Sequence, residues 1–248
     1  MKKFANMTYI DFSVKSNFTK QKNAVNKVRA QFGKEYPNII DGKEVFTSAK
    51  TKSINPAHPS EVIGVFQKAG KTEAEAAVQS AAKAFETWKK VAPKERAEYL
   101  FRAAKEMRKR RLEINAWMIS EVGKNFLEAD ADTCEAIDFL EFYGREMIRY
   151  AGKQPLVGYK GEKNDYFYIP LGVGLVIPPW NFPFAITAGM TTAAIVAGNT
   201  VVLKPSSDSP MMAWLLYDIL KNAGLPDGVL NFCVASGAEA GDYLVAHN

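Results

Sequence analysis

The sequence predicts an α/β fold with an incomplete, doubly wound parallel sheet. Three short runs, 173–177, 200–204 and 229–234, are apolar and rich in β-branched residues, which is typical of strands that are buried on both faces. Helical patterns separate these runs, so the strands are joined by crossovers, which are right-handed in parallel sheets. Three such strands make half of a doubly wound sheet.

The first strand–helix–strand unit, 172–208, carries the first candidate site. Pro178 and Pro179 end the first strand because proline cannot donate to a sheet ladder. Asn181 follows that strand by four residues, and Lys204 ends the next strand. Open α/β sheets bind ligands at the carboxyl ends of their strands, so these two side chains are candidates for a small-molecule site. The alternative is a turn that only packs for stability, with Lys204 in solvent.

Apolar residues at helical spacing predict the helices that surround the sheet. Pro93 opens one helix at a position where its missing N–H costs nothing, and Gly123 is the expected C-terminal stop. Thr72 and Glu75 predict a capping box at the start of another helix. The expected helices run from 72 to 88, from 93 to 123, over about 128–151, over 184–197, from 210 to near 224 and from 237 to 247, with weaker helical character over 19–32.

The chain divides into three expected parts. Residues 1–151 combine an N-terminal extension, short antiparallel strands over 36–66 and helices that pack on the cofactor domain. Residues 152–170 alternate in polarity and predict a β-hairpin arm, with a surface loop as the alternative. A two-stranded hairpin is not stable alone, so the arm should pack on a partner. Residues 171–248 hold the three buried strands.

Composition and charge exclude several classes of protein. Hydrophobic residues make up 47% of the 248 residues, charged residues 24%, and the net charge is +5. The basic run 108–111 lies in a helical pattern and lacks the aromatics that nucleic-acid binding needs, so we interpret it as a solvated face. No apolar run has membrane-spanning length and no signal core follows the first residues. Two cysteines and two distant histidines predict no disulfide framework and no metal site, which fits a cytoplasmic protein.

Two glycine pairs are candidates for binding a dinucleotide. Gly172 and Gly174 flank the start of a strand instead of following one, and no third glycine opens a helix, so they do not fit the usual fingerprint. Gly237 and Gly241 lie four residues apart at the start of the last expected helix, where a pyrophosphate could approach the N–H groups. The alternative is that small residues here only let the helix pack closely on the sheet.

Several motifs occur in an order that resembles the aldehyde dehydrogenase superfamily. They cover roughly residues 36–248 and include Glu121-Val122-Gly123-Lys124, Pro179-Trp180-Asn181-Phe182-Pro183, the run from Gly198 to Pro205 and the run from Ala223 to Asn231. The N-terminal extension, residues 36–42 and residues 129–139 are most similar to the 1-pyrroline-5-carboxylate dehydrogenase branch, which oxidises L-glutamate γ-semialdehyde to glutamate. The resemblance implies the N-terminal half of a Rossmann-like aldehyde dehydrogenase.

The resemblance implies NAD-dependent oxidation of an aldehyde and a role for each matching residue. In the family a cysteine thiolate attacks the aldehyde, a hydride passes to nicotinamide, and a glutamate-activated water hydrolyses the thioester. Asn181 matches the side-chain donor to the tetrahedral oxygen, and Phe182 is a candidate wall of the aldehyde tunnel. The residues that match cofactor contacts are Ile177, Pro178, Pro179 and Trp180 along the cofactor, Lys204 at the adenosine ribose, and Gly237 and Gly241 on the pyrophosphate side.

Two departures from the family pattern change this expectation. Ser207 stands where many NAD-preferring members carry a glutamate, so a 2′-phosphate meets less repulsion and NADP is harder to exclude. The family's catalytic cysteine and glutamate lie downstream of the last helix in this chain. Cys233 should be a buried, inert thiol, and acidic neighbours should raise the pKa of Cys134. We therefore expect an N-terminal half that is inactive alone.

Other functions stay open on the sequence. A half-sheet exposes an edge, so the chain could be a non-catalytic module that binds a nucleotide or a full-length homologue. The substrate could also be another semialdehyde or an aliphatic aldehyde. The expected partners are a small-molecule aldehyde and, in the complete protein, further copies that associate through the arm, with no nucleic acid and no membrane.

Overall fold

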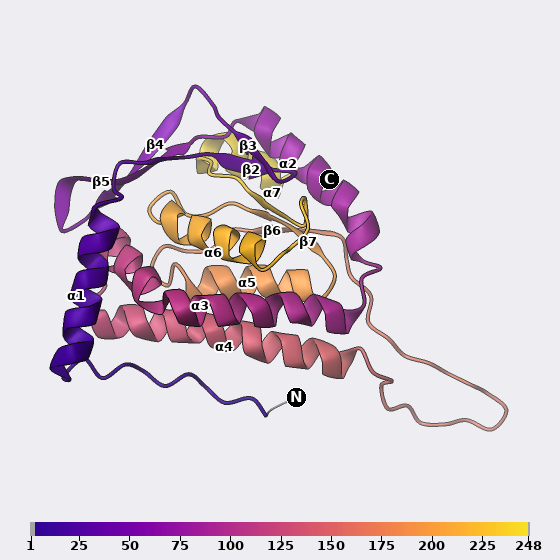
Figure 1. Ribbon diagram of the computed structural model, residues 1–248. Coiled ribbons are helices and arrows are strands. Elements are labelled where there is room, and N and C mark those ends of the chain that lie inside the picture. The colour runs from indigo at the N-terminus through magenta and orange to yellow at the C-terminus, as the bar shows by residue number, and fades with distance from the viewer. Residues whose placement is uncertain (1–2, 248) are drawn as a thin grey trace.

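A five-stranded sheet forms the centre of the computed structural model, which describes residues 3–247 (Figure 1). Its strand order is β3-β2-β8-β7-β6. β6 (Val173–Val176), β7 (Thr200–Leu203) and β8 (Leu230–Phe232) are parallel, which confirms the three predicted buried strands, each slightly shorter than expected. β7 is buried on both faces, as a central parallel strand must be.

β2 (Asn38–Ile40) and β3 (Lys43–Val45) extend this sheet in the antiparallel direction. Two buried asparagines attach them to β8. The Oδ1 atom of Asn38 accepts the backbone N–H of Val234 at 2.8 Å, and Oδ1 of Asn231 accepts that of Asp41 at 3.0 Å. Antiparallel strands were predicted in this region, whereas their attachment to the parallel sheet was not.

A second, three-stranded sheet lies beside the first, in the order β1-β5-β4. β4 (Lys50–Asn55) and β5 (His58–Gln67) are antiparallel, as predicted, with an irregularity over Ser53–Asn55. β1 (Glu35–Tyr36) pairs with β5 in the parallel direction, which corrects the expectation of antiparallel strands throughout.

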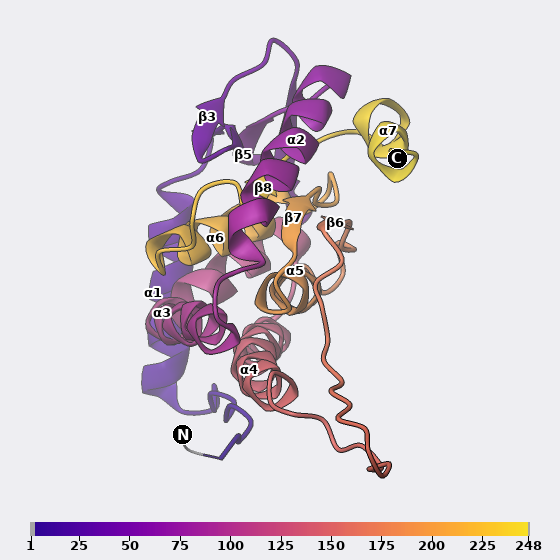
Figure 2. The same cartoon turned by 90° about the vertical axis from the view of Figure 1, so that its right-hand side faces the viewer.

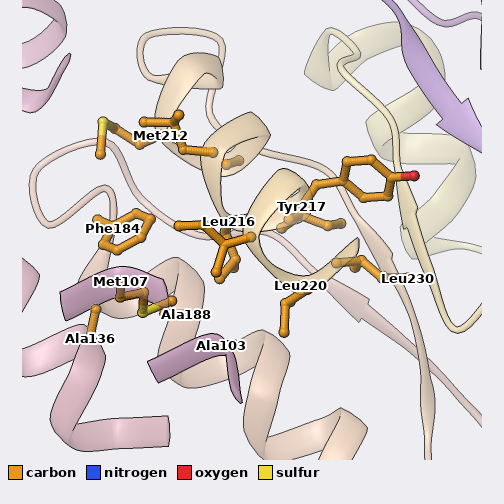
Figure 3. Close-up of a cluster of buried hydrophobic side chains, with 14 of the residues drawn as sticks. Ala103, Met107, Ala136, Phe184, Ala188, Met212, Leu216, Tyr217, Leu220 and Leu230 are labelled. Atoms are coloured by element: carbon orange, nitrogen blue, oxygen red, sulfur yellow. The ribbon is translucent and has the colours of Figure 1, made fainter. Parts of the chain in front are cut away.

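Helices cover both faces of the central sheet (Figure 2). α2 packs on one face, and its alanines share a core with Val202 and Cys233. α5 and α6 pack on the opposite face against Val201 and Leu203, and α3 and α4 form a further layer outside them, with Met107 and Leu216 at the contact (Figure 3). The helices are α1 (Lys15–Arg29), α2 (Lys71–Trp88), α3 (Pro93–Val122), α4 (Phe126–Tyr150), α5 (Ala185–Val196), α6 (Pro210–Asn222) and α7 (Asp242–Val245).

The helix boundaries follow the predicted signals with one correction. Pro93 is the first residue of α3, and Gly123 ends it in the left-handed conformation with φ of 71°. The capping box of α2 lies two residues earlier than predicted. Glu73, not Glu75, caps the helix, because its Oε2 accepts the backbone N–H of Gly70 at 2.8 Å. Glu75 instead accepts hydrogen bonds from side chains at the end of α7.

The N-terminal extension is held by two carboxylates of α4, the buried Asp130 and the partly buried Asp138, and by Arg111 of α3, which donates to the carbonyl of Thr8. The backbone N–H of Ile10 donates to Asp130 at 2.8 Å, and that of Met7 donates to Asp138 at 2.9 Å. Arg111 pairs with the fully buried Asp130, and Arg110 bonds Asp218 of α6. The run 108–111 is therefore only partly solvated, which corrects the prediction of a solvent-facing basic surface.

Residues 152–170 form an arm that projects from the body of the molecule (Figure 1). The chain reverses at 159–162, where the N–H of Glu162 donates to the carbonyl of Tyr159 at 3.1 Å. No strand is assigned over 152–170, so the predicted β-hairpin is wrong for this single chain, and the projecting loop is the better description. The physical reason is that two strands without a third strand or a packing partner are marginal in water.

Within residues 3–247, no helix is long and apolar enough to cross a membrane.

Candidate functional site

The loops that carry the predicted site residues start side by side. In the ladder between β6 and β7, Val176 lies opposite Leu203, and the N–H of Lys204 donates to the carbonyl of Val176 at 2.9 Å. The segments that follow β6 and β7 therefore leave the sheet at the same edge and in the same direction. This is the edge at which α/β sheets bind ligands.

The first loop, 177–184, presents Trp180, Asn181 and Phe182 outward and buries Phe184. Asn181 is exposed, and Trp180 and Phe182 expose 53% and 46% of their surface. Pro178 is buried at the end of β6, whereas Ile177 and Pro179 remain partly or fully exposed. The amide of Asn181 is thus open to a ligand at this edge.

Lys204 is buried instead of solvated. Its residue exposes only 6% of its surface, and its Nζ donates to the carbonyl of Pro205 at 3.2 Å. Burial lowers the pKa of the Lys204 ammonium. The ammonium has three N–H donors, so further donors are left for a ligand. The alternative of a merely solvated lysine is wrong.

A hollow of about 320 Å³ joins the two loops. Trp180 of the first loop and Ser207 and Asp208 of the second line it, together with Lys52, Ser53 and Ile54 of β4 and Pro56 of its turn. Glu121 at the end of α3 forms part of the wall. The hollow is lined by the sequence neighbours of Asn181 and Lys204, so the two loops share a concave surface.

Gly237 and Gly241 lie in a π-helical turn (Gly237–Gly241) that precedes the short α7, which corrects the predicted continuous helix from 237 to 247. Gly237 is exposed, and a Cβ there would meet nothing within 4 Å. A Cβ on Gly241 would lie 3.2 Å from both Cε of Lys204 and the carbonyl of Ser236. Gly241 therefore lets the turn pack on Lys204, which favours the packing interpretation for this glycine, while Gly237 leaves open space.

The two cysteines have no environment that would create a nucleophile. Cys233 is fully buried, and burial raises the pKa of its thiol to about 12. The pKa of the Cys134 thiol is also raised to about 12, mainly by burial, with Asp130 and Asp138 adding to the shift and Arg111 opposing it. The inert state of both thiols was predicted, although burial outweighs the acidic neighbours at Cys134. Within residues 3–247, no group of three or more His, Cys, Asp or Glu side chains could hold a metal ion.

Two buried carboxylates next to the site were not among the candidate residues predicted from the sequence. Glu121 accepts the backbone N–H groups of Met211 and Met212, and Asp132 accepts that of Ala185. The position of Glu121 in the sequence could have indicated its burial. It lies seven residues after Ile114 and three after Met118, so at helical spacing it continues the apolar stripe of α3. An acid on a core-facing stripe requires buried partners.

The family assignment follows from a sequence comparison. Residues 45–248 match the profile of the aldehyde dehydrogenase family. The chain belongs to this family. The motifs identified in the sequence, and the mixed α/β fold built around β6, β7 and β8, agree with this membership.

The most similar relatives carry one name. The chain is 53% identical to 1-pyrroline-5-carboxylate dehydrogenase of Geobacillus thermodenitrificans over 96% of this chain and 46% of the relative. It is 52% identical to 1-pyrroline-5-carboxylate dehydrogenase 2 of Bacillus subtilis, with the same coverage. These matches confirm the resemblance to the 1-pyrroline-5-carboxylate dehydrogenase branch. The chain spans about half the length of the curated relatives it matches.

Solved structures agree with the sequence relatives. A Thermus 1-pyrroline-5-carboxylate dehydrogenase with bound NAD matches with a TM-score of 0.96 at 44% identity, over 100% of this chain and 48% of that one. A Mycobacterium tuberculosis Δ-pyrroline-5-carboxylate dehydrogenase bound with NAD matches with a TM-score of 0.89 at 29% identity, over 98% of this chain and 46% of that one. The fold is therefore that of the N-terminal half of these enzymes.

Proposed function

We propose that this chain supplies the cofactor-binding half of an NAD(P)-dependent aldehyde dehydrogenase that oxidises L-glutamate γ-semialdehyde to glutamate. The observation that carries the proposal is the common end of β6 and β7, from which the Asn181 loop and Lys204 leave the sheet together. Membership of the aldehyde dehydrogenase family supports the reaction class. The substrate is proposed from the relatives named 1-pyrroline-5-carboxylate dehydrogenase.

The residues present fit a dinucleotide at this edge. Lys204 keeps spare N–H donors for ribose hydroxyls, and the open space at Gly237 would let a phosphate group approach the backbone. Trp180 and Ser207 line one concave surface that could hold part of the cofactor. The remaining proposed contacts are those of Ile177, Pro178 and Pro179, while Gly241 would contribute by letting the turn pack beside Lys204. When bound, NAD(P) would supply the hydride acceptor.

Asn181 would act on the aldehyde. Its exposed side-chain N–H is proposed to donate to the oxygen that becomes negatively charged during attack. Phe182, partly exposed beside it, would form an apolar wall of the aldehyde site. Both thiols have pKa values raised to about 12 and stay protonated at neutral pH. We therefore propose that the nucleophile and the general base are not among the residues of this chain.

We propose that the site discriminates only weakly between NAD and NADP. Ser207 is exposed and carries no charge, so it offers no repulsion to a 2′-phosphate. Asp208, its exposed neighbour on the same hollow, is the nearest carboxylate in sequence. NAD is the leading cofactor because related structures contain it, and binding of NADP is expected to be measurable.

Self-association of the complete enzyme is proposed from the arm. Val157 and Leu171, within and just after the arm, expose 96% and 95% of their surface. Apolar side chains this exposed are typical of surfaces that another chain covers. β6 is an edge strand of the sheet, so a second candidate role is binding to a homologous chain.

Calorimetric titration with NAD tests the proposal on this chain. We expect NAD binding, weakened about tenfold or more in Lys204→Met, because a hydrogen bond from a charged donor contributes roughly 1.5–3 kcal/mol. Lys221→Met is the matched control, since Lys221 is an exposed lysine paired with Asp227 away from the edge. The chain alone should not reduce NAD when aldehyde is added. Absence of NAD binding, or aldehyde-dependent NADH formation by the pure chain, would contradict the proposal.

A further inference from the structure

Carboxylates on either side of the turn between α3 and α4, Glu121 at the end of α3 and Asp132 in α4, accept hydrogen bonds from the first turns of the two helices that follow the site strands. α6 begins where Met211 and Met212 donate their backbone N–H groups to Glu121, at 2.9 and 3.1 Å. α5 begins where Ala185 donates to Asp132 at 2.6 Å, and Asp132 in turn pairs with Lys124 at 2.7 Å. Glu121 and Lys124 flank the left-handed Gly123.

We propose that residues 121–124, together with Asp132, form a positioning unit that holds the Asn181 loop and the Lys204–Ser207 loop in register with each other. Glu121 and Val122 line the hollow proposed to hold part of the cofactor, whereas Lys124 and Asp132 do not. The unit would act through the two helix starts, each of which lies a few residues after one of the loops.

The Asn181 loop is fixed on its far side by this unit. Nζ of Lys124 lies 4.2 Å from the centroid of the Phe182 ring, a cation–π contact, and Lys124 is held there by Asp132. The first turn of α5 bonds back to the loop, because the N–H of Ile186 donates to the carbonyl of Phe182 at 3.2 Å. Asn181 therefore lies between the end of β6 and an anchored aromatic neighbour, so its position depends on the Lys124–Asp132 pair.

The Lys204–Ser207 loop is held by Glu121, at the other end of the positioning unit. Oε1 of Glu121 accepts the hydroxyl of Ser53 at 2.7 Å as well as the N–H of Met211, while Oε2 accepts that of Met212. This ties β4 to the start of α6 across the hollow that Ser207 and Trp180 line. The loop 204–209 must connect β7 to this fixed helix start.

Because Glu121 and Asp132 are buried, they depend on the N–H donors at the two helix starts, and this dependence restrains the loops. Glu121 and Asp132 are almost fully buried, and a buried charge is costly unless donors surround it. The helix N-termini supply those donors and a partial positive charge. A displacement of either loop would pull N–H groups away from a buried carboxylate, so the arrangement resists movement of the loops.

The role inferred for the unit rests on the proposed function, because Asn181 and Lys204 are assigned there, but the anchoring can be measured without a ligand. Hydrogen exchange of the full chain is followed at the amides of Phe184 and Ala185 and at those of Met211 and Met212. In Lys124→Met, Asp132 loses its counter-charge and accepts less strongly, so exchange at Ala185 should rise about tenfold. Lys124→Arg keeps the cation and should restore slow exchange.

Trp180 provides a second readout at the site itself. It exposes 53% of its surface, whereas Trp88 and Trp117 are buried and Trp214 is partly buried against the core, so acrylamide quenching reports mainly on Trp180. Lys124→Met should change this quenching. The matched control is Lys89→Met, because Lys89 also pairs with an acid, Glu86 at 2.8 Å, and lies over an aromatic ring at 4.9 Å on α2.

The outcomes separate anchoring from general stability and from cofactor binding. Faster exchange confined to 182–186, with β7 amides unchanged, supports the positioning unit. Unchanged amide exchange and unchanged quenching of Trp180 in Lys124→Met would overturn the positioning unit. An equal rise in the exchange rates of the β7 amides would also overturn it. NAD affinity adds the link to function: the unit predicts weaker binding in Glu121→Gln than in Lys89→Met. If the unaltered chain binds no NAD while the exchange results hold, the proposed function fails and the anchoring stands.

Discussion

At the scale of single residues, the site is supported by charged groups that are buried among the helices and strands around it. Glu121 and Asp132 each accept backbone N–H groups from a helix start and one further side-chain donor. Lys204 is buried beside Gly241, which leaves room for its side chain. Glu121, Asp132 and Lys204 contact residues from distant parts of the sequence. Substituting them should therefore change stability more than substituting a surface residue would.

Glu121 predicts a pH dependence of stability. Burial raises the pKa of Glu121 from 4.5 to about 7 in the folded protein, although Ser53, Met211 and Met212 act in the opposite direction. Between these values the folded state binds more protons than the unfolded state, so the free energy of unfolding falls as pH rises. The contribution present below pH 4.5 is lost as pH passes 7, and amounts to roughly 3 kcal/mol.

The measurement is urea unfolding of the unaltered chain and Glu121→Gln at pH 5 and pH 8. Glutamine does not titrate, so the loss of stability between the two pH values should be smaller in Glu121→Gln by up to the stated amount. Asp218→Asn is a control with a partly exposed acid on α6 that pairs with Arg110. Equal pH dependence in the unaltered chain and Glu121→Gln would contradict the raised pKa.

At the scale of elements, the end of α3 sets the geometry of the positioning unit. Gly123 has φ of 71°, and a Cβ there would lie 3.4 Å from Cγ of Pro56. An L-residue in the left-handed conformation costs about 1–2 kcal/mol. The chain reverses between α3 and α4 through this glycine, so its conformation determines where Glu121 and Lys124 point.

Gly123→Ala should therefore destabilise the chain by about 1–2 kcal/mol and speed exchange at both Ala185 and Met211. The matched control is Gly152→Ala at the end of α4, where the backbone has no left-handed conformation and the nearest contact of a Cβ is also 3.4 Å. The free energy of unfolding of Gly152→Ala should stay within about 0.5 kcal/mol of that of the unaltered chain. Chemical denaturation measures both, and equal effects of the two alanines would show that the conformation at Gly123 is not what matters.

At the scale of the whole molecule, the core and the arm contrast sharply. The body of the protein packs its apolar side chains around the central sheet and between the helices, as part of the core shows (Figure 3). The arm has no sheet partner and leaves apolar side chains in water, from Leu156 to Leu171. These side chains contribute little to folding of the single chain, and we expect them to act in association.

Replacing Val157 and Leu171 by lysine should leave the free energy of unfolding within about 0.5 kcal/mol while reducing self-association. Val245→Lys is the matched control, because Val245 on α7 is also exposed, at 68%, but lies outside the arm. Sedimentation velocity over a range of concentrations measures the association. Association that is equally strong in the doubly substituted chain would exclude the arm as the contact.

The sequence alone predicted the elements whose signals are local. The apolar runs of β6, β7 and β8 identify buried strands because a central parallel strand must be apolar on both faces. Pro93 and Gly123 mark the ends of α3 because each restricts or frees its own backbone. The motif around Asn181 and the match at Lys204 identified the family, since motifs are contiguous in the chain. The roles of the individual site residues remain predictions.

Tertiary structure alone decided which distant groups meet. Asn38 joins β2 to the parallel sheet through Val234, which lies 196 residues further along the chain, and no periodicity in the sequence indicates that bond. The burial of Lys204, the capping of α5 by Asp132 and the capping of α6 by Glu121 arise in the same way. Local patterns describe how a segment orders its own backbone, whereas a buried charge is stabilised by whichever donors the packed helices bring to it.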